Sequence, residues 1–306
     1  MSTFATKSVH AGYTPDATGA VMPAIYATST YAQPAPGEPA GYEYSRSGNP
    51  TRSALENAIA ELEGGSRGYA FASGLAACAT VLELLDQGSH LVAVDDLYGG
   101  TYRLLEKVRS RSAGLRVTYV APGDSAALEQ AIEPDTKMIW VETPTNPLLK
   151  LADLAAIAAI AKKHRLIGVV DNTFASPALQ RPLEYGFDVV LHSATKYLNG
   201  HSDVVAGVAV VGDNPELAQQ LGFLHNAVGR HPRSIQQFPD PARYPYPGAA
   251  HGTPQQQCAA YRPVAGGPTT GGKRLLSRPD QPSATRAGGA ANATVWRYDL
   301  TAPEGG

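Results

Sequence analysis

The sequence predicts an α/β domain with a mostly parallel sheet. Between residues 51 and 229, short apolar runs of strand length alternate with longer helical segments. Such alternation is typical of parallel sheets whose strands are joined by helices. The chain has 306 residues, 43% of them hydrophobic, which is enough to bury one large core or two modest ones. We therefore expect an extended arm over 1–50, the α/β domain over 51–229 and a tail over 230–306.

Each element of the predicted domain follows from its local pattern. Helices are indicated by longer segments with helical spacing of apolar residues, the first of which is closed by two glycines. Strands are indicated by short apolar runs that end in polar or turn residues. In chain order the segments are TRSALENAIAELEGG (helix, 51–65), YAFA (strand, 69–72), GLAACATVLELLDQG (helix, 74–88), HLVAVDD (strand, 90–96), TYRLLEKVRSR (helix, 101–111), KMIWVETP (strand, 137–144), DLAAIAAIAKKH (helix, 153–164), LIGVVDN (strand, 166–172), DVVLHS (strand, 188–193) and VVAGVAVVG (strand, 204–212).

Charge and composition argue against several classes of protein. The net charge is −2 and the pI is near 6.4, so no nucleic-acid partner is expected. The N-terminus MSTFATKSVHAGYTPD lacks the apolar core of a secretion signal, and no run reaches the roughly 20 apolar residues that span a bilayer. Cys78 and Cys258 form neither a disulfide framework nor a metal cluster. We expect a cytoplasmic protein with no metal and with Cys78 in the core.

The segment 230–306 has a different composition from the rest of the chain. It holds 11 of the 24 prolines and 10 of the 31 glycines, but only seven residues from Ile, Leu, Val, Met and Phe. That composition buries too little apolar surface to offset chain entropy, which predicts disorder. The alternative is an unusual ordered small domain. Our hypothesis is a shifted reading frame, a truncation scar or a sequencing error, which translation of the other frames after Gly229 would test.

The string DVVLHSATKYLNGHSD (188–203) carries the strongest functional signal. A strand leads into Ser193, Thr195 and Lys196. A lysine in this position can hold an aldehyde cofactor as a Schiff base, while the hydroxyls contact a phosphate. A solvated lysine is the simpler alternative. The whole string resembles the lysine signature of the Cys/Met-metabolism family of enzymes that depend on pyridoxal 5′-phosphate (PLP), and the resemblance implies that Lys196 is the Schiff-base lysine.

Two further motifs suit the same cofactor. Asp171 ends the apolar run of VVDNTFASP (169–177), where a carboxylate could pair with a pyridinium nitrogen or simply make a turn. Ser73 and Gly74 open a predicted helix, where free amides could bind phosphate or Ser73 could act only as a cap. The family resemblance gives Asp171 the pyridinium role and assigns Ser73, Gly74 and Leu75 to the phosphate.

The remaining motifs take their roles from the resemblance. It implies that Tyr98 of DDLYGGTYR (95–103) stacks on PLP and helps to protonate the leaving group, and that Arg103 meets the substrate's distal carboxylate. It places Asn146 of WVETPTNP (140–147) near the cofactor's phenolic oxygen, and leaves Glu142 of the same motif without a firm role. Tyr44 and Arg46 of YEYSRSGNPTR (42–52) resemble a pair that reaches the PLP phosphate of the neighbouring subunit.

The resemblance also implies a fold and an activity. The fold is the large domain of an aspartate-aminotransferase-like (fold type I) PLP enzyme. We expect the usual C-terminal small domain, with its arginine for the substrate α-carboxylate, to be missing. The activity is transsulfuration of a small amino-acid substrate at Cγ, like cystathionine γ-synthase of methionine biosynthesis or cystathionine γ-lyase of cysteine metabolism, in a homo-oligomer that is at least a dimer and a tetramer by resemblance. The alternative is a PLP-binding but catalytically impaired remnant. A dehydrogenase is disfavoured because no G-x-G-x-x-G follows a strand.

Overall fold

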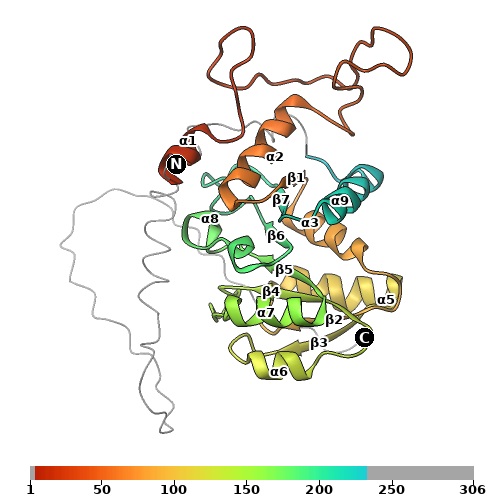
Figure 1. The fold of residues 1–306 in the computed structure, drawn as a ribbon, viewed down its shortest axis with the longest axis vertical. Helices are drawn as coiled ribbons and strands as arrows, with labels where there is room; N and C mark the ends of the chain where they lie inside the picture. The colour runs from red at the N-terminus through yellow and green to blue at the C-terminus, as the bar shows by residue number, and fades with distance from the viewer. Residues whose placement is uncertain (1–3, 233–306) are drawn as a thin grey trace, which may run out of the picture. The chain divides into compact units, whose positions relative to one another are not determined.

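A computed structural model describes residues 4–232 of the chain, which lie within one compact unit. Its centre is a seven-stranded sheet in the order β1-β7-β6-β5-β4-β2-β3 (Figure 1). The strands are β1 (Arg67–Phe71), β2 (His90–Val94), β3 (Arg116–Val120), β4 (Thr136–Glu142), β5 (Ile167–Asp171), β6 (Val189–His192) and β7 (Gly207–Val211).

Helices occupy most of the connections between these strands (Figure 1). The α-helices are α1 (Phe4–His10), α2 (Pro50–Glu63), α3 (Gly74–Val81), α4 (Gly99–Arg103), α5 (Ser110–Ala113), α6 (Ser125–Gln130), α7 (Leu154–His164), α8 (Ser176–Leu179) and α9 (Pro215–Val228). Two short 3-10 helices cover Leu82–Leu84 and Pro182–Tyr185, and a π-helical stretch covers Leu104–Arg109.

The sheet is mostly parallel, as predicted. Strands β3, β2, β4, β5 and β6 run parallel to one another, and only β7 is antiparallel to its neighbours β6 and β1. Because parallel strands end at the same edge of a sheet, the polar residues after β2, β4, β5 and β6 are brought to one edge.

The sheet is buried on both faces. On β7, Val208 and Val210 pack in a cluster with Ile59 and Ala60 of α2, whereas the alternating residues Ala209 and Val211 belong to a larger cluster. That larger cluster includes side chains of α3, α7 and α9. This two-sided burial explains why the strands read as continuous apolar runs.

All the predicted strands and helices are present, with shifted ends. The expected helix 101–111 begins earlier, at Gly99, and includes the π-helical stretch. Cys78 is buried in the core, as predicted. The elements that the sequence pattern did not predict include β3, α6, α8 and α9.

The two ends of the domain required corrections. The expectation of a wholly extended arm is wrong over Phe4–His10, which forms α1 and packs near α2. At the other end, Gly229 closes α9 in the left-handed conformation. Packing nevertheless continues past it, because the Arg230 carbonyl accepts a hydrogen bond from the Ala72 amide at 2.9 Å. The predicted disorder of the tail concerns residues that, from 233 onward, lie outside the described part of the chain.

Candidate cofactor site

The carboxylates at the ends of β4 and β5 are neighbours. Glu142 is the last residue of β4 and Asp171 the last residue of β5, and the two are paired across the strands in register. Asp171 is paired on its other side with Leu191 of β6. Asp171 therefore lies between the segment that contains Asn146 and the segment that leads to Lys196.

The Asp171 carboxylate is held by one neighbouring residue, Thr173. The amide and hydroxyl of Thr173 both donate hydrogen bonds to Asp171 Oδ1, at 3.1 and 2.5 Å. Burial raises the pKa of Asp171, while the Thr173 hydrogen bonds and the nearby His192 act to lower it. Both bonds go to Oδ1, so Oδ2 is the oxygen that could accept from a pyridinium N–H. This carboxylate therefore fits the ring nitrogen of PLP.

Thr173 also connects Asp171 to the segment that carries Lys196. Its hydroxyl oxygen accepts a hydrogen bond from the Ser193 amide at 2.8 Å, and the Lys196 amide donates to the Ser193 carbonyl at 3.1 Å. The Thr195 hydroxyl accepts from the Ala206 amide at 3.1 Å, which fixes the turn against the segment before β7. Lys196 itself has an exposed side chain.

The start of α3 lies directly against this turn. Ser73 is the N-cap, and its hydroxyl accepts from the Ala76 amide at 3.1 Å. At Gly74 the backbone approaches so closely that an added Cβ would lie 2.9 Å from Ser193 Cβ. The first amides of a helix have no partners within the helix and attract anions. These amides, together with the Ser193 hydroxyl, fit a phosphate group.

Glu142 is the site residue whose role the sequence did not indicate. Its buried carboxylate accepts from the Tyr98 amide through Oε2 and from the Asn146 amide through Oε1, each at 2.8 Å. Burial and the neighbouring Asp171 carboxyl raise the pKa of Glu142. Glu142 thus positions the loops after β2 and β4, although nothing in its sequence motif distinguished this task from an ordinary buried polar residue.

The ring of Tyr98 lies beside the start of α3. A Cβ added at Gly100 would lie 2.4 Å from Tyr98 Cε1 and 3.1 Å from Leu75 Cδ1. Tyr98 is 46% exposed, so part of its side chain is accessible. Arg103, at the end of α4, is also exposed.

Arg46 contacts Tyr44 and the end of α9. Arg46 Nη1 donates to the Asn226 carbonyl at 3.0 Å and to Asn226 Oδ1 at 3.3 Å, and its guanidinium lies 5.4 Å from the centre of the Tyr44 ring. Within residues 4–232, no recorded contact joins either residue to the Lys196 turn.

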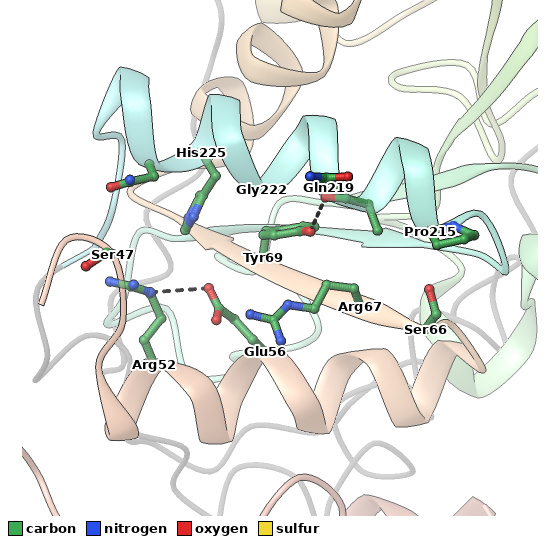
Figure 2. Close-up of a pocket in the computed structure, with 12 residues that line it drawn as sticks. Ser47, Arg52, Glu56, Ser66, Arg67, Tyr69, Pro215, Gln219, Gly222 and His225 are labelled. Atoms are coloured by element: carbon green, nitrogen blue, oxygen red, sulfur yellow. Dashed lines mark hydrogen bonds and ion pairs between the residues drawn. The ribbon is translucent and has the colours of Figure 1, made fainter. Parts of the chain in front are cut away.

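A separate pocket lies between α2, β1 and α9 (Figure 2). Its lining includes Arg52, Glu56, Arg67, Gln219 and His225. None of the residues predicted to bind the cofactor lines it, so it is distinct from the edge of the sheet described above. In the described part of the chain, no group of three His, Cys, Asp or Glu residues is arranged to hold a metal ion. No helix among those residues combines the length and apolarity needed to cross a membrane.

The fold and the candidate site together define an α/β protein in which side chains suited to PLP lie at the carboxyl ends of the parallel strands. The family described as "Cys/Met metabolism PLP-dependent enzyme" matches residues 5–238. The chain belongs to this family, whose members depend on PLP.

Similar proteins carry three different activity names. A cystathionine β-lyase of Coxiella burnetii is 61% identical over 73% of this chain, and a probable cystathionine γ-synthase of Herpetosiphon aurantiacus is 52% identical over 75%. The crystal structure of cystathionine γ-lyase from Lactobacillus plantarum, complexed with L-serine, has a TM-score of 0.77 and 47% identity over 81% of this chain.

This chain corresponds to only part of the length of each of these relatives. It covers 58% of the Coxiella protein, 72% of the Herpetosiphon protein and 64% of the Lactobacillus chain. The similarity shows the family and the fold of the matched region.

Proposed function

We propose that this chain binds PLP through Lys196 and that its site performs transsulfuration chemistry at Cγ of a small amino acid, as in cystathionine γ-synthase or γ-lyase. The observation that carries the proposal is the connected series Asp171–Thr173–Ser193–Lys196. It joins a carboxylate suited to a pyridinium nitrogen to the lysine suited to an aldehyde.

Each residue has a defined task in the proposed site. Asp171 holds the proton on the ring nitrogen, so that bound PLP supplies an electron sink. The start of α3, with Ser73, Gly74 and Leu75, binds the phosphate. The hydroxyls of Ser193 and Thr195 bind the same group.

The other residues act on the ring or on the substrate. Tyr98 would stack on the ring face of bound PLP, and Asn146 would contact its phenolic oxygen. Arg103 binds the distal carboxylate of the substrate. The Lys196 amine removes the Cα proton and returns protons further along the substrate.

The choice of Cγ over Cβ depends on one motif. Relatives named cystathionine β-lyase are at least as similar to this chain as those named γ-synthase or γ-lyase, so overall identity does not distinguish the two positions. The segment YGGTYR, from Tyr98 to Arg103, supports action at Cγ, because it resembles the corresponding segment of cystathionine γ-synthase and γ-lyase, which both act at Cγ.

The first experiment tests PLP binding. The purified chain is loaded with PLP, and its visible absorption is compared with that of Lys196→Ala and of Lys162→Ala, a control at an exposed lysine on α7. We expect the band of covalently held PLP in the wild type and in Lys162→Ala, and its loss in Lys196→Ala. An unchanged band in Lys196→Ala would contradict the assignment of the lysine.

The second experiment tests the position of cleavage. Hydrolytic cleavage of cystathionine at Cγ–S yields cysteine, 2-oxobutyrate and ammonia, whereas cleavage at Cβ–S yields homocysteine, pyruvate and ammonia. A synthase would instead join cysteine to O-succinylhomoserine and release succinate. Homocysteine as the main product would overturn the assignment to Cγ.

A PLP band without turnover of either substrate favours a second candidate function, PLP binding without catalysis. The family match ends at residue 238, and the resemblance places the arginine for the substrate α-carboxylate in a C-terminal domain that residues 230–306 do not resemble. Without that arginine the substrate would be poorly oriented, and orientation supplies much of the rate in two-component reactions.

A further inference from the structure

Two fully buried ionisable residues lie directly behind the candidate site. His192 is the last residue of β6 and immediately precedes Ser193, while Glu63 is the last residue of α2. His192 Nε2 lies 2.5 Å from Glu63 Oε1, and both side chains are 0% exposed. The distance is that of a charge-assisted hydrogen bond.

The same carboxylate oxygen also contacts the end of the neighbouring strand. Asn172 Nδ2 donates to Glu63 Oε1 at 3.0 Å, and Asn172 immediately follows Asp171. Glu63 Oε1 thus contacts both Asn172, which follows Asp171, and His192, which precedes Ser193.

Asn172 is itself fixed on its other side. Its Nδ2 donates to the Gln180 carbonyl at 2.8 Å, and its Oδ1 accepts from Gln180 Nε2 at 2.9 Å. Its amide donates to the Leu191 carbonyl of β6 at 2.9 Å. Glu63 therefore completes a buried set of hydrogen bonds that connects the ends of β5 and β6.

Burial of the Glu63–His192 pair costs free energy of folding. A buried carboxylate loses hydration that two hydrogen bonds replace only in part. In the described part of the chain, Glu63 Oε2 and His192 Nδ1 have no hydrogen-bond partner. Apolar residues of similar size would fill the same space at lower cost. A role in the precise positioning of the ends of β5 and β6 would explain why the pair is present despite this cost.

We propose that Glu63 is a positioning residue: through His192 and Asn172 it fixes Asp171 and the Ser193–Lys196 segment relative to each other without touching the cofactor. This inference rests on the proposed function, because the two segments it aligns are the two halves of the proposed PLP site. Affinity for PLP should then depend on a carboxylate of α2.

The test compares Glu63→Leu, which removes the acceptor, with Glu63→Gln, which keeps an acceptor oxygen at the same place. Glu61→Leu is the matched control, because Glu61 is exposed on the same helix. We expect Glu63→Leu to raise the Kd for PLP on the order of ten-fold, a magnitude known for residues that orient direct ligands. Glu63→Gln should restore most of the affinity, and Glu61→Leu should match the wild type.

A second readout does not require the cofactor. Amide hydrogen exchange of the PLP-free protein should become faster at Asn172 and Ser193 in Glu63→Leu, while the amides of β2 keep their wild-type protection. Should Glu63→Leu fail to fold, Asn172→Ala, which removes one donor to the carboxylate, replaces it with the same expectation.

The outcomes separate the two proposals. A wild-type chain that binds no PLP would overturn the proposed function, and the exchange measurement alone would then decide whether Glu63 aligns the strand ends. A wild type that binds PLP, together with a Glu63→Leu variant equal to Glu61→Leu in Kd and exchange, would leave the proposed function standing and overturn the role of Glu63. Failure of Glu63→Gln to restore affinity would also overturn it, because the acceptor oxygen would not be the feature that matters.

Discussion

At the scale of single residues, Gly74 shows how little space separates the start of α3 from the end of β6. A Cβ at this position would lie 2.9 Å from Ser193 Cβ and 3.0 Å from Ser193 Cα. Because the second contact is with the backbone, one of the two segments must move. Overpacking of this kind costs about 1–3 kcal/mol of unfolding free energy. We expect Gly74→Ala to lower the urea midpoint and weaken PLP binding, measured by denaturation and by titration.

The control for this substitution is Gly123→Ala, at an exposed glycine with no atom within 4 Å of an added Cβ. Alanine restricts the unfolded chain more than glycine does, so this variant should be as stable as the wild type or slightly more stable. Wild-type stability and PLP affinity in Gly74→Ala would contradict the close approach of α3 to Ser193.

At the scale of elements, the edge strand β1 is protected by side chains of two helices. Strand β1 lies at one end of the sheet order, and Figure 2 shows it between α2 and α9. Glu56 Oε1 accepts from the Ala70 amide at 2.9 Å, and His225 Nε2 lies 2.7 Å from the Ala70 carbonyl oxygen. An open strand edge can pair with another chain. These two side chains occupy the backbone groups of Ala70 that would allow such pairing.

The two protecting residues respond to pH in opposite directions. Burial, opposed by Arg52, raises the pKa of Glu56 from 4.5 to about 7. Between about pH 4.5 and 7 the folded state therefore binds more protons at Glu56 than the unfolded state does. The contribution of Glu56 to the unfolding free energy falls as the pH rises through this range. Burial lowers the pKa of His225 from 6.5 to about 4, so its contribution rises between about pH 4 and 6.5. In the wild type the two effects largely cancel.

In a variant without the Glu56 carboxyl, the pH dependence of stability that comes from His225 should no longer be cancelled. We expect the unfolding free energy of Glu56→Gln to rise more steeply between pH 4.5 and 6.5 than that of the wild type. Urea denaturation at several pH values measures both slopes. Parallel curves for the two proteins would show that Glu56 does not carry a raised pKa in the folded state.

Elements with continuous apolar runs were predictable because both faces of the sheet are buried. Strand β3 was missed because Arg116–Val120 is largely half-buried and mixes polar with apolar residues. The direction of β7 could not be predicted, because Gly207–Val211 reads like any other buried strand. Strand direction depends on the path of the whole connection. Helix α1 is a short segment with Thr, Ser and His, which has little helical signal of its own.

At the scale of the whole molecule, the sequence indicated the residues at the sheet edge but not what holds them. Asp171 and Lys196 each follow an apolar strand, and the rule that parallel strands end together predicts that they meet. The contact between Glu63 and His192 joins residues 129 positions apart. No local pattern pairs them, because a glutamate at a helix end and a histidine at a strand end are each ordinary on their own.

The role of Arg46 decides whether a PLP site is complete within one chain. In the structure Arg46 contacts Asn226 of its own chain, near the C-terminus of α9, where a cation is favourable. The family resemblance instead places Arg46 at the PLP phosphate of a neighbouring subunit. In a two-fold dimer each arm would then complete the other subunit's site.

Mixing two inactive variants distinguishes these roles. In a mixed dimer, the Arg46→Ala subunit keeps Lys196 and the Lys196→Ala subunit keeps Arg46. These two residues would together complete one of the two PLP sites. Random assembly of equal amounts should thus restore about a quarter of the wild-type sites, counted by the PLP absorption band at a PLP concentration too low to load Arg46→Ala alone. If Arg46 serves only its own chain, mixing restores nothing, and Arg46→Ala shows instead a small loss of stability of about 0.3–1 kcal/mol.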